Sequence, residues 1–287
     1  MKLIQCILTD NDCFRTKRGI KPKGVMVHST GADNPTLRRY VQPVKGGDGD
    51  YAALMAQLGR NKNGNHWNRP GLDVCVHGFI GQLADGSVAS VQTLPWTHRG
   101  WHAGTGTSGG SANNTHISFE ICEDGLTDPT YFKLVYREAV ELTAHLCQVC
   151  GLDPLADGVV ICHQEGYRRG IASNHGDVLH WFPRFGKSMD DFRADVAAEL
   201  GRRPEAPAVD GSNDRNDKEE DSMVYYERLG DVADSYKATI RKLMERGALR
   251  GRSDPDPDPD SLEDNILNIS EEYCRVMATL DKLGVLG

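Results

Sequence analysis

Five short apolar segments, rich in β-branched residues, most constrain what this chain of 287 residues folds into. Each has the length and composition of a β-strand. Asp85–Gly86 is a turn signal between two of them, so we expect these two to form a hairpin. The predicted strands are Val25–Val27, Val74–Ile80, Val88–Thr93, Ile117–Ile121 and Val159–Cys162.

Two segments between and after these strands have helical periodicity. Tyr131–Cys150 carries apolar residues at helical spacing, which gives a wide apolar stripe, and Gly151 ends it as a C-terminal glycine commonly does. Met189–Leu200 is a second predicted helix, closed by Gly201. Strands and helices together predict an α/β fold, with a mixed central sheet flanked by helices.

Composition narrows the class of protein. Hydrophobic residues make up 39% and charged residues 26% of the chain, as in soluble globular proteins. The apolar runs are too short to span a bilayer, so no membrane insertion is expected. The chain contains no basic run, which makes nucleic acid a poor candidate partner. The N-terminus lacks the apolar core of a signal peptide, so we expect synthesis in the cytoplasm without a cleaved signal, and eight reduced cysteines.

The formal net charge of −8 divides the chain unevenly. The segment 205–287 holds 11 basic and 20 acidic residues, whereas the first 204 residues are nearly balanced. We therefore predict a catalytic domain over 1–201, a linker over 202–222 and a small α-helical module over 223–287. Helices are expected in the module at Ser235–Arg246 and from Ser270 onward. The Asp-Pro run at 254–260 is either a stiff spacer or a calcium site.

Two of the ten histidines directly end apolar runs. His28 follows the first predicted strand and His163 follows the last. Side chains at strand ends are held on rigid elements beside the crevices in which sheet proteins form their sites. Imidazole and carboxylate ligands suit zinc, and three such ligands leave one position open for catalysis. From spacing alone, Asp177, His175 and His180 compete for the third position.

Glu120 is a second chemical candidate. Ile117, Phe119 and Ile121 alternate with Ser118 and Glu120, so Glu120 is expected on the face opposite the large apolar residues. It is either a solvated charge on a half-buried strand or a general base beside a metal.

The order of these elements resembles a known family. His28, then Trp101–Gly104, Asn114 before Ile117–Glu120, then His163 and Asp177 are similar to the zinc-dependent N-acetylmuramoyl-L-alanine amidases of type 2, which are related to peptidoglycan-recognition proteins. The resemblance covers about residues 20–197. Around His163–Phe185 it is strongest to amidases of clostridial prophages.

The resemblance implies a fold, a cofactor and a reaction. It implies one Zn²⁺ ion held by His28, His163 and Asp177, with Glu120 as the general base. His175 stands where relatives often carry an oxyanion-stabilising lysine. The substrate would be peptidoglycan, cleaved between N-acetylmuramic acid and L-alanine. An endolysin or autolysin of this kind acts at the bacterial cell wall, after holin-type release.

The resemblance also suggests substrate contacts. His102 and Asn114 are candidates, although a turn histidine and a cap asparagine are equally good interpretations. His77 either lines the groove or packs in the core.

The C-terminal module has a weaker resemblance of its own, to a single S-layer-homology module that binds cell-wall polymers. Homo-oligomerisation through this unit is a further expectation, because so small a helical unit gains stability from a partner. Two other functions stay open: a non-catalytic muropeptide-binding module, and a cytosolic amidase that acts on soluble recycled muropeptides.

Overall fold

The computed structural model describes residues 1–47, 49–202, 225–229, 232–246 and 266–270, together with Cys274, Met277, Ala278 and Asp281. Contacts between residues group the chain into two compact units, Met1–Asp210 and Gly211–Gly287.

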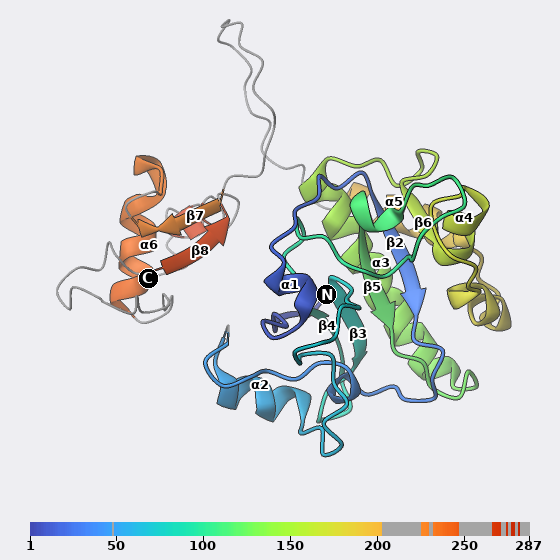
Figure 1. Cartoon of the computed structure of the whole chain (residues 1–287), viewed down its shortest axis with the longest axis horizontal. Coiled ribbons are helices and arrows are strands. Elements are labelled where there is room, and N and C mark those ends of the chain that lie inside the picture. Colours follow the sequence, from blue (N-terminus) through green and yellow to red (C-terminus); the bar gives the residue numbers. More distant parts are fainter. Residues whose placement is uncertain are drawn as a thin grey trace, which may run out of the picture. The chain divides into compact units, whose positions relative to one another are not determined.

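The first unit is built on a six-stranded mixed sheet (Figure 1). The strand order is β1-β4-β3-β5-β2-β6, and every neighbouring pair is parallel except the β3–β4 hairpin. This hairpin confirms the turn predicted at Asp85–Gly86. The strands are β1 (Leu3–Gln5), β2 (Gly24–Ser29), β3 (Gly78–Gln82), β4 (Val88–Gln92), β5 (His116–Ile121) and β6 (Val160–Cys162).

Helix α3 (Pro129–Cys150) packs on one face of this sheet. It begins after Asp128, whose carboxylate accepts two backbone N–H groups of the first turn, and it ends at Gly151 in the left-handed conformation. The apolar side chains of β2 and β5 lie in the same hydrophobic cluster as α3 and α5 (Met189–Arg202). Helix α3 therefore covers this face of the sheet from β4 across β3 to β2.

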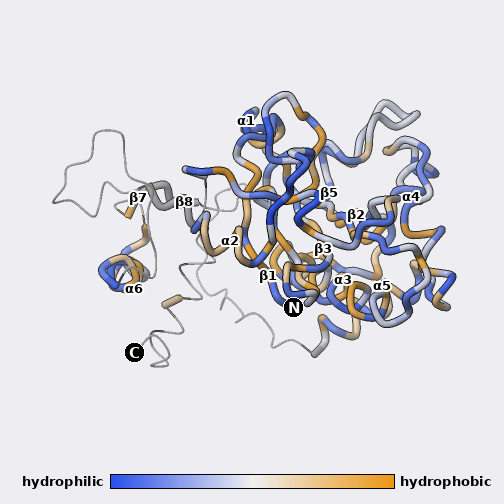
Figure 2. The backbone as a smooth tube through the Cα atoms, turned by 90° about the horizontal axis from the view of Figure 1, so that it is seen from below, coloured by the Kyte–Doolittle hydropathy of each residue, from blue (hydrophilic) through white to orange (hydrophobic). Residues whose placement is uncertain are grey.

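A second hydrophobic cluster combines β1, β3 and β4 with three short helices. These are α1 (Asp12–Arg15), η1 (Leu37–Arg39) and α2 (Tyr51–Leu58). Hydrophobic stretches follow the central strands and α3, whereas most connecting loops are hydrophilic (Figure 2). None of the helices in the described part of the chain has the length and apolar character needed to cross a bilayer. All eight cysteines are described, none is in a disulfide, and seven are buried.

One predicted strand is shorter than expected. The segment Val74–His77 is not part of β3 but forms an isolated bridge between Cys75 and Trp101. The remaining short elements of the first unit lie near the ends of β5 and β6: η2 (Ala112–Asn114), α4 (His163–Arg168), η3 (Asp177–His180) and η4 (Phe182–Phe185).

The second unit contains helix α6 (Asp234–Glu245), which confirms the helix predicted from Ser235. Apolar side chains of α6 form a small core with Leu229, Val232 and Cys274. The unit also contains an antiparallel pair, β7 (Tyr225–Arg228) and β8 (Ile266–Ser270), that the sequence did not predict. Most of the helix expected after Ser270, most of the linker and the Asp-Pro run lie outside the described residues.

Candidate metal centre

Two neighbouring parallel strands bring His28 and His163 together. His28 is the fifth residue of β2, and His163 is the first residue of α4, directly after β6. Because β2 and β6 are parallel neighbours, their carboxyl ends meet at one edge of the sheet. Both histidines are buried there.

Asp177 completes a triangle of donor atoms. Its Oδ2 lies 3.0 Å from Nδ1 of His28 and 3.0 Å from Nδ1 of His163. The two Nδ1 atoms are 3.2 Å apart. Among the described residues, these three form the one cluster of histidine, cysteine and acidic side chains that could hold a metal ion. The structure therefore places a carboxylate oxygen of Asp177, rather than a ring nitrogen of His175 or His180, in the position that completes the triangle.

The triangle fits a tetrahedral zinc ion. Ligand distances of about 2.0–2.1 Å imply separations of about 3.3 Å between ligand atoms, close to those observed. Two imidazoles and a carboxylate are also a donor set that zinc accepts in catalytic sites. A further sign is that Glu120 Oε2 and His102 Nε2 are buried without hydrogen-bond partners in the described residues. Such atoms are expected where water or a ligand completes the bonds.

Asp177 has an unusual backbone. Its φ is +42°, in the left-handed region, which only two other non-glycine residues of the described chain adopt. Asp and Asn tolerate this region better than other side chains with a Cβ, yet it still costs free energy. Residues held in such a backbone conformation cluster at functional sites.

His28 and Asp177 each affect the pKa of the other. Burial lowers the pKa of His28, while Asp177 opposes that shift. Burial would raise the pKa of Asp177, but hydrogen bonds with His163 and His28 outweigh it and hold this pKa well below its usual value. A neutral His28 beside an ionised Asp177 is the combination that metal binding requires of these two residues.

Glu120 stands beside His28 on the sheet. The two residues are paired in the parallel register of β2 and β5. Ile117, Phe119 and Ile121 belong to the cluster beneath α3, so Glu120 is on the other face, as the alternation predicted. Burial raises the pKa of Glu120 well above its usual value, and the charges of Asp177 and Glu123 add to the shift.

His102 lies against the metal triangle. Its Nδ1 is 3.0 Å from Nε2 of His28, the ring nitrogen of His28 that faces away from Asp177. When Nδ1 of His28 is a ligand atom, its Nε2–H is the donor in this bond. Burial and the neighbouring histidines lower the pKa of His102 well below its usual value.

Asn113, which the sequence pattern did not single out, holds the loop that carries His102. Its Oδ1 accepts the backbone N–H groups of His102 and Ala103, and its Nδ2 donates to the carbonyl of Gly104. Asn113 is fully buried, whereas Asn114 is exposed and accepts a hydrogen bond from Arg99. Nothing in the local pattern distinguishes the two asparagines.

Ser173 is a second residue that the sequence pattern did not single out. Its hydroxyl lies 3.2 Å from Nε2 of His163 and 3.1 Å from Nδ1 of His175. His175 is exposed, and its ring centre is 4.7 Å from that of His163. The candidate oxyanion residue thus lies beside the triangle and is connected to it through Ser173.

The other candidates lie elsewhere. His77 is fully buried: its Nε2 donates to the carbonyl of His98, and its Nδ1 accepts from the N–H of Ser118. His77 therefore occupies the core, one of the two positions that the sequence left open, and neither ring nitrogen is left for a substrate. His180 pairs with Glu123 at 3.1 Å.

A family model matches most of the first unit. The family model described as N-acetylmuramoyl-L-alanine amidase matches residues 18–177, more than half of the chain. No curated protein sequence matches.

Several solved structures are similar. A Staphylococcus aureus hydrolase, AmiA, in complex with its ligand is 19% identical, with a TM-score of 0.44, over 70% of this chain and 83% of its own. The PlyG catalytic domain is 20% identical, with a TM-score of 0.43, over 74% and 100%. A mutant endolysin from Bacillus subtilis is 22% identical, with a TM-score of 0.40, over 68% and 99%.

Proposed function

This chain belongs to the N-acetylmuramoyl-L-alanine amidase family, and we propose that it is a zinc-dependent hydrolase of peptidoglycan. The bond cleaved is the amide between the lactyl group of N-acetylmuramic acid and L-alanine. The observation that carries this proposal is the triangle of His28, His163 and Asp177, with the unpartnered carboxylate oxygen of Glu120 beside it.

His28, His163 and Asp177 would hold the ion. When bound, zinc supplies Lewis acidity, which polarises the scissile carbonyl and lowers the pKa of water. His102 would keep His28 in the tautomer with a free Nδ1, and Ser173 would do the same for His163. The burial of both histidines supports this role, since it keeps competing water away.

Glu120 is the proposed general base. It takes a proton from the attacking water, whose oxygen bonds to the carbonyl carbon. The C–N bond then breaks, and Glu120 returns the proton to the leaving amine of L-alanine. The raised pKa of Glu120 supports both steps, because a carboxyl group with a raised pKa takes up a proton more readily and can still return it to the leaving amine. His175 would donate a hydrogen bond to the developing oxyanion.

The wider organisation is also part of the proposal. Residues 1–201 form the catalytic domain, 202–222 the linker and 223–287 a module for wall binding or oligomerisation. A phage or prophage endolysin, or an autolysin, would use such a module to stay at the cell wall. The excess of acidic residues after 205 and the separate core of the second unit support the division.

Digestion of purified peptidoglycan tests the reaction. We expect new N-terminal L-alanine on unbroken glycan strands, detected by mass spectrometry. The products should disappear on treatment with a chelator and return with added Zn²⁺, and Glu120→Gln should be inactive while it still binds metal. New reducing sugar ends with intact amide bonds would refute the proposal. Metal and wall binding without any cleavage would favour the muropeptide-binding alternative.

A further inference from the structure

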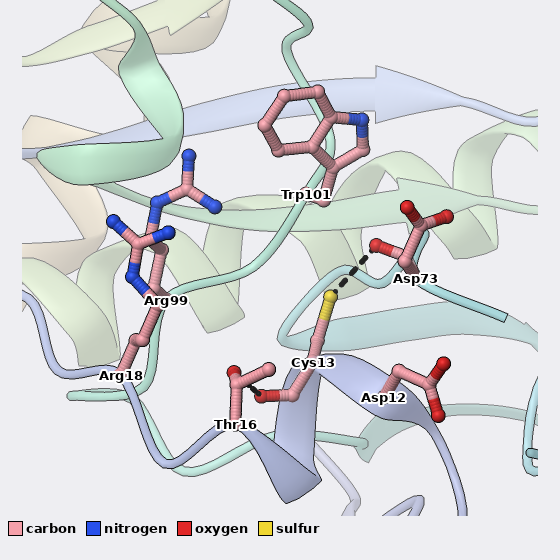
Figure 3. A pocket seen from close by; sticks show the side chains of 7 residues that line it. All are labelled: Asp12, Cys13, Thr16, Arg18, Asp73, Arg99 and Trp101. Carbon is pink, nitrogen blue, oxygen red and sulfur yellow. Dashed lines mark hydrogen bonds between the residues drawn. The ribbon is translucent and has the colours of Figure 1, made fainter. Parts of the chain in front are cut away.

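A pocket of the first unit lies beside Trp101, the residue directly before His102 (Figure 3). Arg18 and Arg99 extend along one side of the pocket toward Trp101, and Asp12 and Asp73 lie on the other. None of these residues belongs to the metal triangle, and the proposed reaction does not use them.

The backbone forces the two arginines together. The N–H of Arg99 donates to the carbonyl of Arg18 at 2.7 Å, and the N–H of Ile20 donates to the carbonyl of Thr97 at 2.7 Å. Gly19 and His98 form the bridge between these bonds. Chain pairing therefore places Arg18 and Arg99 opposite each other, and both side chains line the same pocket.

Arg99 is also fixed in place. Its Nε donates to Oδ1 of Asn114 at 2.6 Å, and its guanidinium carbon lies 5.1 Å from the ring centre of Trp101. Both contacts leave its terminal nitrogens available. Burial and the charge of Arg18 lower the pKa of Arg99, which reflects the cost of placing like charges together.

The described residues offer no ion pair that offsets that cost. Among them, neither Arg18 nor Arg99 has an ion-pair partner. The two carboxylates of the pocket make no direct ion pair with the arginines. Within the described residues, neither Asp12 nor Asp73 lies within ion-pair distance of Arg18 or Arg99, and Oδ1 of Asp12 accepts the N–H of Gly71. Two adjacent guanidinium forks with free donors are the arrangement that binds a planar or tetrahedral oxyanion.

We propose that Arg18 and Arg99, beside Trp101, form an anion-binding subsite for a negatively charged group of the cell wall. Two sources share this chemistry: a carboxylate of the stem peptide and a phosphate of a wall polymer. The pocket includes Trp101, the residue directly before His102, and His102 contacts His28. That the ligand is a wall component rests on the proposed function, whereas anion binding itself does not.

Tryptophan fluorescence of the full chain tests this subsite without requiring catalysis. Trp101 is the most exposed of the tryptophans, 37% exposed, and it contacts Arg99. Three probes are titrated: a muramoyl dipeptide of L-alanine and D-glutamate with free carboxylates, the same compound with both carboxylates amidated, and glycerol phosphate. Variants are Arg18→Gln, Arg99→Gln, Arg99→Lys and Trp101→Phe, with Arg38→Gln as a matched control on an exposed arginine outside the pocket.

We expect a charged probe to change the fluorescence, and Trp101→Phe to abolish the change. Each Arg→Gln variant should bind about tenfold more weakly, the loss of a charge-assisted hydrogen bond, whereas Arg38→Gln should bind normally and Arg99→Lys should recover part of the loss. Binding of the free but not the amidated dipeptide identifies the stem carboxylate; binding of glycerol phosphate identifies the wall polymer.

No binding of either charged probe, or no effect of the arginine variants on the binding of the probe that binds, overturns the subsite even if the protein hydrolyses peptidoglycan. Arginine-dependent binding without hydrolysis would leave the subsite standing and remove the proposed reaction.

Discussion

At the scale of single residues, the centre depends on Asp177, which combines a left-handed backbone with contacts to both histidines. We expect Asp177→Asn to keep the fold, because Asn tolerates this backbone conformation. Loss of the charged ligand should weaken Zn²⁺ binding at least ~100-fold, the upper end of what loss of an outer-shell partner costs. Competition with a chromophoric chelator measures this. Asp33→Asn, at an exposed aspartate, is the control and should bind normally; unchanged affinity in Asp177→Asn would exclude Asp177 as a ligand.

His77 makes stability depend on pH. Burial lowers its pKa from 6.5 to about 4. Between about pH 6.5 and pH 4, His77 is therefore protonated in the unfolded chain but neutral in the folded protein. Full stability is present above pH 6.5 and falls as the pH drops, by about 1.4 kcal/mol per unit from this residue.

Urea unfolding of the chelator-treated protein at pH 6.5 and pH 5.0 measures this effect. We expect the loss of unfolding free energy to be about 1.6 kcal/mol smaller in His77→Gln than in the unchanged protein. His175→Gln, at an exposed histidine, should leave the loss as it is. The difference between the two pH values is the readout, because His77→Gln also removes two buried hydrogen bonds at every pH. Parallel losses in all three proteins would contradict this account.

Sequence could predict some of these residues and not others. His28 and His163 end apolar runs, so a local pattern marks them as strand-end residues. The choice of Asp177 over His175 and His180 depends on how the chain after α4 returns to the sheet, which spacing does not encode. Asn113 and Ser173 act through hydrogen bonds to residues distant in sequence or to the backbone, so no local pattern identifies them.

At the scale of elements, β2 carries the site, because it pairs with β5 on one side and β6 on the other. Its first residue, Gly24, has no room for a side chain: an added Cβ would lie 2.4 Å from the carbonyl oxygen of Val159 and 2.7 Å from the ring of His116. We expect Gly24→Ala to push β2 and β6 apart and to cost about 1–3 kcal/mol of unfolding free energy. It should also weaken Zn²⁺ binding, since His28 lies in β2 and His163 directly follows β6.

Gly201→Ala is the matched control, because nothing lies within 4 Å of its Cβ position near the end of α5. This variant should be neutral or slightly more stable. Thermal unfolding of the two variants measures the difference. Equal stability of Gly24→Ala and Gly201→Ala would mean that the backbones of β2 and β6 are not so closely packed.

Elements were predictable where periodicity or turn chemistry is strong. Helix α3 has a long apolar stripe between Asp128 and Gly151, and the β3–β4 hairpin has Asp85–Gly86. Strand β1 has only three residues, and its pairing with β4 joins segments far apart in sequence, which local patterns do not show. The segment Val74–His77 has the composition of a strand but lies in a loop, where Cys75 pairs with Trp101.

At the scale of the whole molecule, the sheet, the metal triangle and the anion subsite all lie within the first unit, Met1–Asp210. The described residues of the second unit include a separate small hydrophobic core. A unit of this length supplies little stability by itself, which favours support from a partner, another copy of the chain included. Catalysis and attachment to the wall are therefore expected to be separable.

A chain of residues 1–210 should retain Zn²⁺ binding and the hydrolysis of soluble muropeptides at rates within about twofold of the full chain, because no residue of the proposed site is removed. It should lose most sedimentation with purified cell walls if the second unit is the attachment module. Light scattering of both proteins completes the test: a full-length oligomer and a monomeric 1–210 chain would assign self-association to residues 211–287. A full-length monomer would exclude that role, and equal sedimentation of both chains would place wall attachment in the catalytic unit instead.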